Sequence, residues 1–217
     1  MSQANRAPRG TVRLVMFDCD GVLFDSRQAN ILFYNELLRR LGRPPMTGVE
    51  VDYVHVHTAG ESVAYLLRHQ PPTPEAWQQA ACALDYGPFI DHMSPEPTVH
   101  EALRGLKSRC RLAVCTNRTT TIGAVLAHHG LAGYFDLVVS AHDVPRPKPH
   151  PDELLRALEA LGCPPEASLY VGDAAVDMEA SLAAGVPFVA YRNPALEAAA
   201  HIDFLSQIAA LIDASRH

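Results

Sequence analysis

Residues 12–25 read Val-Arg-Leu-Val-Met-Phe-Asp-Cys-Asp-Gly-Val-Leu-Phe-Asp. The apolar run up to Phe17 is typical of a buried strand, and Asp18 and Asp20 follow it directly, with Gly21 behind them. Ligands of open parallel sheets gather at the carboxyl edge of the strands. Two carboxylates so close in sequence repel each other unless a positive charge lies beside them. The stretch therefore predicts a site for a hard cation such as Mg²⁺.

The composition favours a globular chain with a substantial core. Of the 217 residues, 48% are hydrophobic, which suffices for one domain plus a smaller insertion. The formal charge of −6 argues against nucleic-acid binding, which needs a basic face. No apolar run in the sequence approaches membrane-spanning length, and the polar N-terminal tail lacks the apolar block of a signal peptide. We therefore expect a cytoplasmic protein that binds neither nucleic acid nor membrane.

The cysteines give no sign of a disulfide framework or a redox motif. They are odd in number, scattered, and without a Cys-x-x-Cys pair. Plain buried thiols in a reducing compartment are the expected reading. They are Cys19, Cys82, Cys110, Cys115 and Cys163.

The order of the expected elements predicts the fold class. After a first strand over 12–17, only helices are expected up to about residue 95, namely 26–41, a second from Thr47, 61–69 and 73–92. From there helices over 98–107, 120–129, 151–161, 175–184 and 204–214 alternate with strands over 111–115, 137–139, 168–171 and 188–190. Such alternation predicts a parallel sheet with right-handed crossovers.

The sequence thus predicts an α/β protein with a Rossmann-like core, residues 1–25 and 96–217, and an all-helical insertion, residues 26–95. Both ends of the insertion emerge beside Asp18 and Asp20. We expect it to form a lid that excludes water from the acids and selects substrates.

Polar residues follow the other expected strands as well. The strand over 111–115 ends in Thr116-Asn117, which is either a helix cap or part of an anion site. Lys148 lies between two prolines that restrict its backbone, so it is either a side chain aimed at a site or a solvated charge. Asp173 and Asp177 follow the strand over 168–171, as ligands or as acids favoured by a helix start.

Taken together, these groups would converge at one edge of the sheet. Carboxylates suit Mg²⁺, whereas the Lys148 ammonium, the Thr116 hydroxyl and backbone amides suit phosphate oxygens. The combination predicts a site for a phosphoryl group and a divalent cation.

The motifs resemble those of the haloacid dehalogenase superfamily of aspartate-nucleophile phosphotransferases. They are Phe-Asp18-Cys-Asp20-Gly-Val, Val-Cys-Thr116-Asn117-Arg, Pro-Lys148-Pro-His-Pro-Asp and Val-Gly-Asp173-Ala-Ala-Val-Asp177-Met. They arrive in the family's order, and the resemblance covers nearly the whole chain. Within the superfamily the chain looks most like phosphoglycolate phosphatases and sugar-phosphate phosphatases, and the insertion resembles their helical cap.

The resemblance implies a mechanism. Asp18 would be the nucleophile that forms an aspartyl-phosphate, and Asp20 the general acid and base. Carboxylates of Asp18 and Asp173 and the backbone carbonyl of Asp20 would hold Mg²⁺, with Asp177 in support.

For the phosphoryl oxygens, the resemblance implies that Thr116 and Lys148 hold them, helped by the backbone amide of Asn117. The substrate would be a small phosphorylated metabolite, and the protein a monomer or a homodimer.

Alternatives remain open at this level. Val22 stands where phosphatases of the superfamily commonly have Thr, and Gly-Val is frequent in phosphoglucomutase-like members, so a sugar-phosphate mutase is a second reading. Pyrophosphatase and phosphonate hydrolase activity are further enzyme alternatives. An acid at position 20 argues against dehalogenase chemistry. A non-enzymatic binding protein is a third class, but none of Asp18, Asp20, Lys148 or Asp173 is lost.

Substrate preference is expected to depend on polar residues of the insertion. His55 and His57 could be read as metal ligands, but two histidines at this spacing without a nearby acid or thiol are more typical of a surface or a substrate edge. The candidates for substrate binding in the insertion are Asn30, Tyr34, His55, His57 and Arg68.

Overall fold

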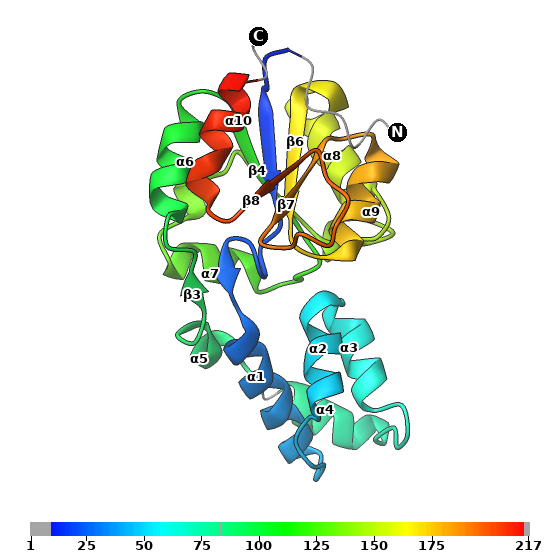
Figure 1. Cartoon of the computed structure of the whole chain (residues 1–217). Helices are drawn as coiled ribbons and strands as arrows, with labels where there is room; N and C mark the ends of the chain where they lie inside the picture. The colour runs from blue at the N-terminus through cyan, green and yellow to red at the C-terminus, as the bar shows by residue number, and fades with distance from the viewer. Residues whose placement is uncertain (1–9, 83, 215–217) are drawn as a thin grey trace. The chain divides into compact units, whose positions relative to one another are not determined.

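The computed structural model describes residues 10–82 and 84–214 (Figure 1). The chain divides into two compact units. One runs to Phe24 and resumes at Pro95, and the other is formed by Asp25–Ser94. Each unit is described separately below.

The first unit is built on a six-stranded parallel sheet in the order β5-β4-β1-β6-β7-β8. The central strand β1 pairs with β4 on one side and β6 on the other, and Phe17 lies opposite Val114 and Val171. Its strands are β1 (Leu14–Phe17), β4 (Arg111–Thr116), β5 (Leu137–Ser140), β6 (Ser168–Gly172), β7 (Phe188–Tyr191) and β8 (Ala200–Ile202).

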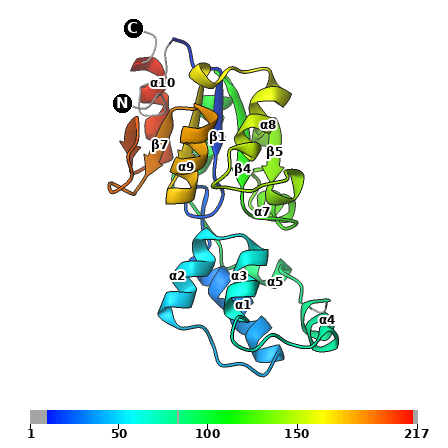
Figure 2. The ribbon, with the colours of Figure 1, turned by 90° about the vertical axis from the view of Figure 1, so that its right-hand side faces the viewer.

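Helices cover both faces of this sheet. Figures 1 and 2 show α6 and α10 on one side and α8 and α9 on the other. Central strands buried on both faces read as continuous apolar runs, as Leu14–Phe17 does. The helices are α6 (Val99–Lys107), α7 (Ile122–His128), α8 (Asp152–Leu161), α9 (Ala175–Ala184) and α10 (Ile208–Ala214), with 3₁₀ turns at Ala132–Tyr134, Ala141–Asp143, Pro165–Ala167 and Leu205–Gln207.

The second unit contains helices α1–α5 around a small apolar core. Tyr34, Leu37, Val54 and Ala80 are its buried members, with Trp77 among the side chains packed against them. Thr47 begins α2 with a capping box, in which its hydroxyl accepts from the Glu50 amide and the Glu50 side chain accepts from the Thr47 amide. The helices are α1 (Arg27–Arg40), α2 (Gly48–Val56), α3 (Ala59–Leu66), α4 (Pro74–Cys82) and α5 (Gly87–Ile90).

The chain passes between the two units twice, through the short strands β2 (Phe24–Asp25) and β3 (Ser94–Pro95). These two strands pair with each other in a separate two-stranded sheet. The chain therefore leaves the α/β unit and returns to it through two backbone segments that lie side by side.

The α/β fold with a helical segment between β1 and β4 is confirmed, and most expected elements lie within a few residues of their observed bounds. The single helix expected over 73–92 is wrong, because the chain forms α4 and then a separate α5. Pro88 lies in the first turn of α5, where its missing backbone N–H costs no intrahelical hydrogen bond, whereas in the interior of one long helix it would break one. The strand β8 was not expected from the sequence, and it extends the sheet by a sixth strand.

Three of the four described thiols, those of Cys19, Cys115 and Cys163, are buried as expected, and that of Cys110 is half-buried. Cys19, Cys110, Cys115 and Cys163 are free, and burial raises the pKa of the Cys19 and Cys115 thiols well above its usual range. The Cys82 side chain lies outside the described residues. Within 10–82 and 84–214, none of the helices has both the length and the apolar character that crossing a bilayer requires.

Candidate functional site

Polar side chains meet at the carboxyl ends of three adjacent strands. Asp18 follows β1, Thr116 ends β4, and Asp173 follows β6. The backbone amide of Asp18 donates to the carbonyl of Val171 at 2.9 Å, which ties the first acid to the neighbouring strand. The predicted convergence of these segments at one edge of the sheet is therefore present.

Lys148 is the centre of this arrangement. Its ammonium nitrogen Nζ lies 2.8 Å from Asp18 Oδ1, 2.6 Å from Asp177 Oδ1 and 2.8 Å from the Tyr170 hydroxyl. The residue is only 3% exposed. Burial alone would lower the pKa of Lys148, but the carboxylates of Asp177 and Asp18 outweigh it and raise this pKa well above its usual range. Lys148 is thus a fixed positive charge between two acids.

Three acids form a cluster suited to a cation. Carboxylate oxygens of Asp18, Asp173 and Asp177 lie within 4.8 Å of one another. Burial and the neighbouring acids raise the pKa of Asp18 to about 7 and that of Asp173 to about 8. Acids that are costly to ionise together are stabilised by a bound divalent cation, and oxygen donors are those that Mg²⁺ prefers. The donor set fits Mg²⁺.

Two glycines allow the close approach of these acids. A Cβ on Gly21 would lie 2.1 Å from Asp173 Oδ2, and Gly21 has a φ of +82°, in the left-handed region that favours glycine. A Cβ on Gly172 would lie 2.4 Å from the Cβ of Asp177. Any side chain at either position would displace an acid of the cluster.

Asp177 is held by its own helix start. Its Oδ2 accepts from the backbone amides of Asp173 at 3.2 Å and Ala174 at 3.1 Å, while Oδ1 faces Lys148. Asp177 thus contacts Lys148 directly, and a supporting role for Asp177 in metal binding stays a prediction.

Asp20 lies in a different environment from Asp18. The Arg118 guanidinium binds it through two contacts, Nε to Oδ2 at 3.0 Å and Nη2 to Oδ1 at 2.6 Å. Arg118 belongs to the motif Val-Cys-Thr116-Asn117-Arg, but no role was expected for it. Its position directly after Thr116-Asn117 was the available signal.

Thr116 and Asn117 shape the loop after β4. The Thr116 hydroxyl accepts from the Arg118 amide at 3.2 Å, and the Asn117 side-chain amide donates to the Lys148 carbonyl at 3.1 Å. The second bond joins the β4 loop to the Lys148 loop, so the two predicted phosphate-binding segments are linked.

Two further buried groups were not foreseen. The Tyr170 hydroxyl contacts Asp177 Oδ1 at 2.9 Å and donates to the Cys115 carbonyl at 3.1 Å, and its pKa is raised by burial and by Asp177. Glu153 is fully buried, and its carboxyl oxygens have no hydrogen-bond partner within the described part of the chain. Burial raises the pKa of Glu153 to about 7. No pattern in the sequence distinguishes Tyr170 from a core residue of β6.

Two substrate-binding candidates lie on α1 of the helical unit. The Asn30 side-chain oxygen accepts from the Tyr86 hydroxyl at 3.0 Å. Tyr34 is 5% exposed and packs in the apolar cluster of this unit, edge-on to Phe33. These contacts are those of packed side chains, and a substrate role for either residue stays a prediction.

The other candidates lie on or beside α2 and α3. The His57 ring stacks on Tyr53 at 3.8 Å, Tyr53 stacks on Tyr65 at 3.8 Å, and the Arg68 guanidinium lies 3.9 Å from the centre of the Tyr65 ring. His55 is half-buried. The stack explains the placement of His57 and Arg68 through packing, and substrate roles for all three candidates stay predictions.

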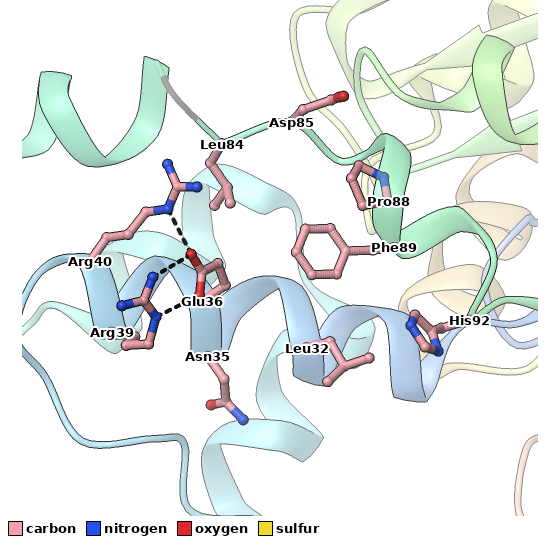
Figure 3. Close-up of a pocket in the computed structure, with 10 residues that line it drawn as sticks. All are labelled: Leu32, Asn35, Glu36, Arg39, Arg40, Leu84, Asp85, Pro88, Phe89 and His92. Carbon is pink, nitrogen blue, oxygen red and sulfur yellow. Dashed lines mark hydrogen bonds and ion pairs between the residues drawn. The ribbon is translucent and has the colours of Figure 1, made fainter.

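The helical unit also carries an open groove of about 660 Å³ between α1 and the α4–α5 segment (Figure 3). Apolar and polar side chains both line it, and at one end Arg39 and Arg40 both turn to Glu36. None of the predicted site residues lines it. The lining residues are Leu32, Asn35, Glu36, Arg39, Arg40, Leu84, Asp85, Pro88, Phe89 and His92.

Comparison with known proteins decides the family. The pattern of the haloacid dehalogenase-like hydrolases matches residues 15–191. The chain belongs to the haloacid dehalogenase-like hydrolase family. A phosphoglycolate phosphatase of Rhodobacter capsulatus is 32% identical to this family member, over 86% of this chain and 89% of the relative.

Solved structures share the fold of this chain. A subfamily IA, variant 1 hydrolase of Geobacter sulfurreducens PCA is 38% identical, with a TM-score of 0.81 over 92% of this chain and 99% of that one. A β-phosphoglucomutase of Clostridium difficile, 20% identical, shares the fold, with a TM-score of 0.81 over 94% of this chain and 98% of that one. The predicted family and hydrolase class are confirmed, while the roles of individual residues stay predictions.

Proposed function

We propose that this family member is a Mg²⁺-dependent phosphatase that hydrolyses a small phosphorylated metabolite of the phosphoglycolate or sugar-phosphate kind. The observation that carries the proposal is the pairing of Asp18 with Lys148 at 2.8 Å beside the carboxylates of Asp173 and Asp177. The residues that we propose as nucleophile, fixed positive charge and metal-binding acids therefore lie close together. Relatives named phosphoglycolate phosphatase support the substrate class.

Asp18 attacks the phosphorus atom and forms an aspartyl-phosphate. Lys148 holds Oδ1 of Asp18 at 2.8 Å, so the attack on phosphorus is assigned to Oδ2 of this carboxylate. Asp20 donates a proton to the leaving alkoxide and then takes a proton from the water that releases phosphate.

Lys148, the Thr116 hydroxyl and the backbone amide of Asn117 hold the phosphoryl oxygens, whose negative charge is spread in a loose transition state. Asp18, Asp173 and the backbone carbonyl of Asp20 hold Mg²⁺, supported by Asp177. When bound, this cation supplies positive charge against the phosphoryl oxygens.

The helical segment 26–95 acts in this proposal as the cap that selects the substrate and excludes water during the reaction. Its candidate residues for recognition are Asn30, Tyr34, His55, His57 and Arg68.

A sugar-phosphate mutase is the second candidate, favoured by Val22 after Gly21 and by the fold shared with a β-phosphoglucomutase. The two activities differ in the fate of the phosphoryl group. A hexose 1-phosphate incubated with the protein gives free phosphate in one case and the 6-phosphate isomer in the other. Isomer formation without net phosphate release would replace the phosphatase proposal.

Phosphate release from a panel of substrates tests the proposal. The panel contains phosphoglycolate, hexose phosphates, nucleotides, pyrophosphate and a phosphonate, with Mg²⁺ present or chelated. We expect Mg²⁺-dependent release from small monoesters, and loss of turnover in Asp18→Asn with an unchanged circular-dichroism spectrum. Full activity of Asp18→Asn would remove the nucleophile assignment.

A further inference from the structure

We propose that Arg118 is a positioning residue that sets the Asp20 carboxylate for its two proton transfers. The inference rests on the phosphatase function proposed above. Its basis is geometric, since two guanidinium nitrogens of Arg118 bind the two oxygens of Asp20 at 3.0 and 2.6 Å. A planar guanidinium fork fixes both the place and the plane of a carboxylate.

Arg118 is itself held in place. Its remaining terminal nitrogen Nη1 donates to the Thr121 hydroxyl at 3.0 Å, and its backbone amide donates to the Thr116 hydroxyl at 3.2 Å. The Arg118 side chain is 6% exposed and that of Asp20 is 17% exposed. A buried and anchored arginine thus fixes a more exposed carboxylate that lies in the loop after β1.

The two acids of the first motif are divided between two cations. Asp18 pairs with Lys148, whereas Asp20 pairs with Arg118. This arrangement gives the proposed nucleophile and the proposed proton carrier different positive partners, although they are two residues apart in the chain. A lysine at position 118 would keep the charge but not the fork.

The pairing is compatible with proton transfer. A carboxylate offers about four lone-pair sites, and the fork takes one on each oxygen. In the first step the Asp20 proton moves to the leaving alkoxide as the Asp18–phosphorus bond forms and the ester bond breaks. In the second step a proton of the attacking water moves to Asp20 as the water oxygen bonds to phosphorus and the Asp18–phosphorus bond breaks.

A double-mutant cycle tests the inference with Arg118→Met, Asp20→Asn and the double variant. The readout is kcat/KM for phosphoglycolate, an alkyl ester, and for 4-nitrophenyl phosphate, whose leaving group needs no proton. We expect Arg118→Met to lower kcat/KM for phosphoglycolate about 10–100-fold and that for the aryl ester less than about threefold. In the Asp20→Asn background, Arg118→Met should lower kcat/KM for phosphoglycolate by less than a further factor of about three. The reason is that both changes remove the same function, proton transfer by Asp20.

Two further variants complete the design. Arg118→Lys, which retains the charge, should show an intermediate loss with the same difference between the two esters, and it carries the test if Arg118→Met does not fold. Arg39→Met is the matched control, because Arg39 binds Glu36 through the same fork at 2.7 and 2.8 Å on the exposed face of α1. This control should leave both kcat/KM values unchanged.

Other outcomes overturn the inference. Equal losses on both esters, or losses that multiply in the double variant, would show that Arg118 acts through the substrate or the fold. Full activity of Asp20→Asn would remove the acid/base role and this inference with it. Turnover in Asp18→Asn would instead mark failure of the proposed function, so the two failures are distinguishable.

Discussion

Lys148 provides one positive charge to two buried carboxylates, those of Asp18 and Asp177. Removing one partner of a buried ion pair leaves an uncompensated charge, which costs about 3–5 kcal/mol. We expect Lys148→Met to lower the free energy of unfolding by about this amount in chelated buffer and to abolish phosphate release. Urea denaturation and the phosphate assay measure the two effects.

Lys107→Met is the matched control for this prediction. Lys107 binds Asp136 at 2.8 Å, but the two side chains are 36% and 28% exposed. Solvent screening limits such a pair to less than about 1 kcal/mol. Equal losses of unfolding free energy in Lys148→Met and Lys107→Met would contradict a larger contribution from the buried charges.

Gly21→Ala tests how closely the loop after β1 approaches Asp173. The added Cβ would overlap the Asp173 carboxylate, so this proposed Mg²⁺ ligand must move. We expect the Mg²⁺ concentration for half-maximal activity to rise about 10–100-fold, the range seen when groups that orient metal ligands are lost. A Mg²⁺ titration of initial rates measures this.

Gly42→Ala separates backbone strain from the steric effect on the metal site. Gly42 also has a positive φ, +67°, but apart from Gly42 and its two chain neighbours no atom of the described residues lies within 4 Å of the point where its Cβ would stand. This variant should lose about 1 kcal/mol of stability and keep the wild-type Mg²⁺ requirement. Equal Mg²⁺ requirements in both alanine variants would contradict the role assigned to Gly21.

At the scale of elements, the sequence predicted what depends on local patterns. The helix over 175–184 agrees with α9 (Ala175–Ala184), and Thr47 begins α2 as expected. By contrast, β8 contains only Ala200–Ile202, too short for a period-two pattern to show. Its place in the sheet depends on pairing with β7, which is a long-range property.

The same distinction between local patterns and long-range contacts applies to the candidate site. Asp18, Thr116 and Asp173 were predictable because parallel strands bring their carboxyl ends to one edge. The contact of Arg118 with Asp20 joins residues 98 positions apart and depends on side-chain conformation in two loops. Tyr170 lies in an apolar strand and becomes a site residue only through its contacts with Lys148 and Asp177.

At the scale of the whole molecule, the acid cluster should make stability depend on pH and on Mg²⁺. The pKa of Asp18 is raised to about 7 and that of Asp173 to about 8, so the folded state retains protons that the unfolded state loses above about pH 4. Their contribution to stability is complete below about pH 4 and is lost as pH rises to about 8. Chelated protein should therefore lose stability from these groups between pH 5 and 8.

Mg²⁺ should offset this loss, because it binds the ionised carboxylates. We expect the increase in Tm on adding Mg²⁺ to be larger at pH 8 than at pH 5, and Asp173→Asn to reduce this difference. Thermal unfolding of both proteins with Mg²⁺ or chelator, from pH 5 to 8, is the measurement. A Mg²⁺ effect that is independent of pH would contradict the assignment.

The pairing of β2 with β3 leads to a prediction about the helical segment. Residues 26–93 replaced by a short glycine-containing turn would leave both paired strands and the six-stranded sheet connected. We expect this shortened protein to unfold cooperatively on heating and to hydrolyse 4-nitrophenyl phosphate. Its kcat/KM values for different phosphate esters should differ less from one another than those of the full-length protein. Absence of a cooperative transition would show that the α/β unit needs the helices to fold.

Such a junction also has an evolutionary consequence. A segment that enters and leaves through adjoining strands can be exchanged by recombination without altering any strand neighbour in the sheet. Descendants of one ancestral hydrolase could then acquire new selectivities while inheriting the reaction chemistry intact.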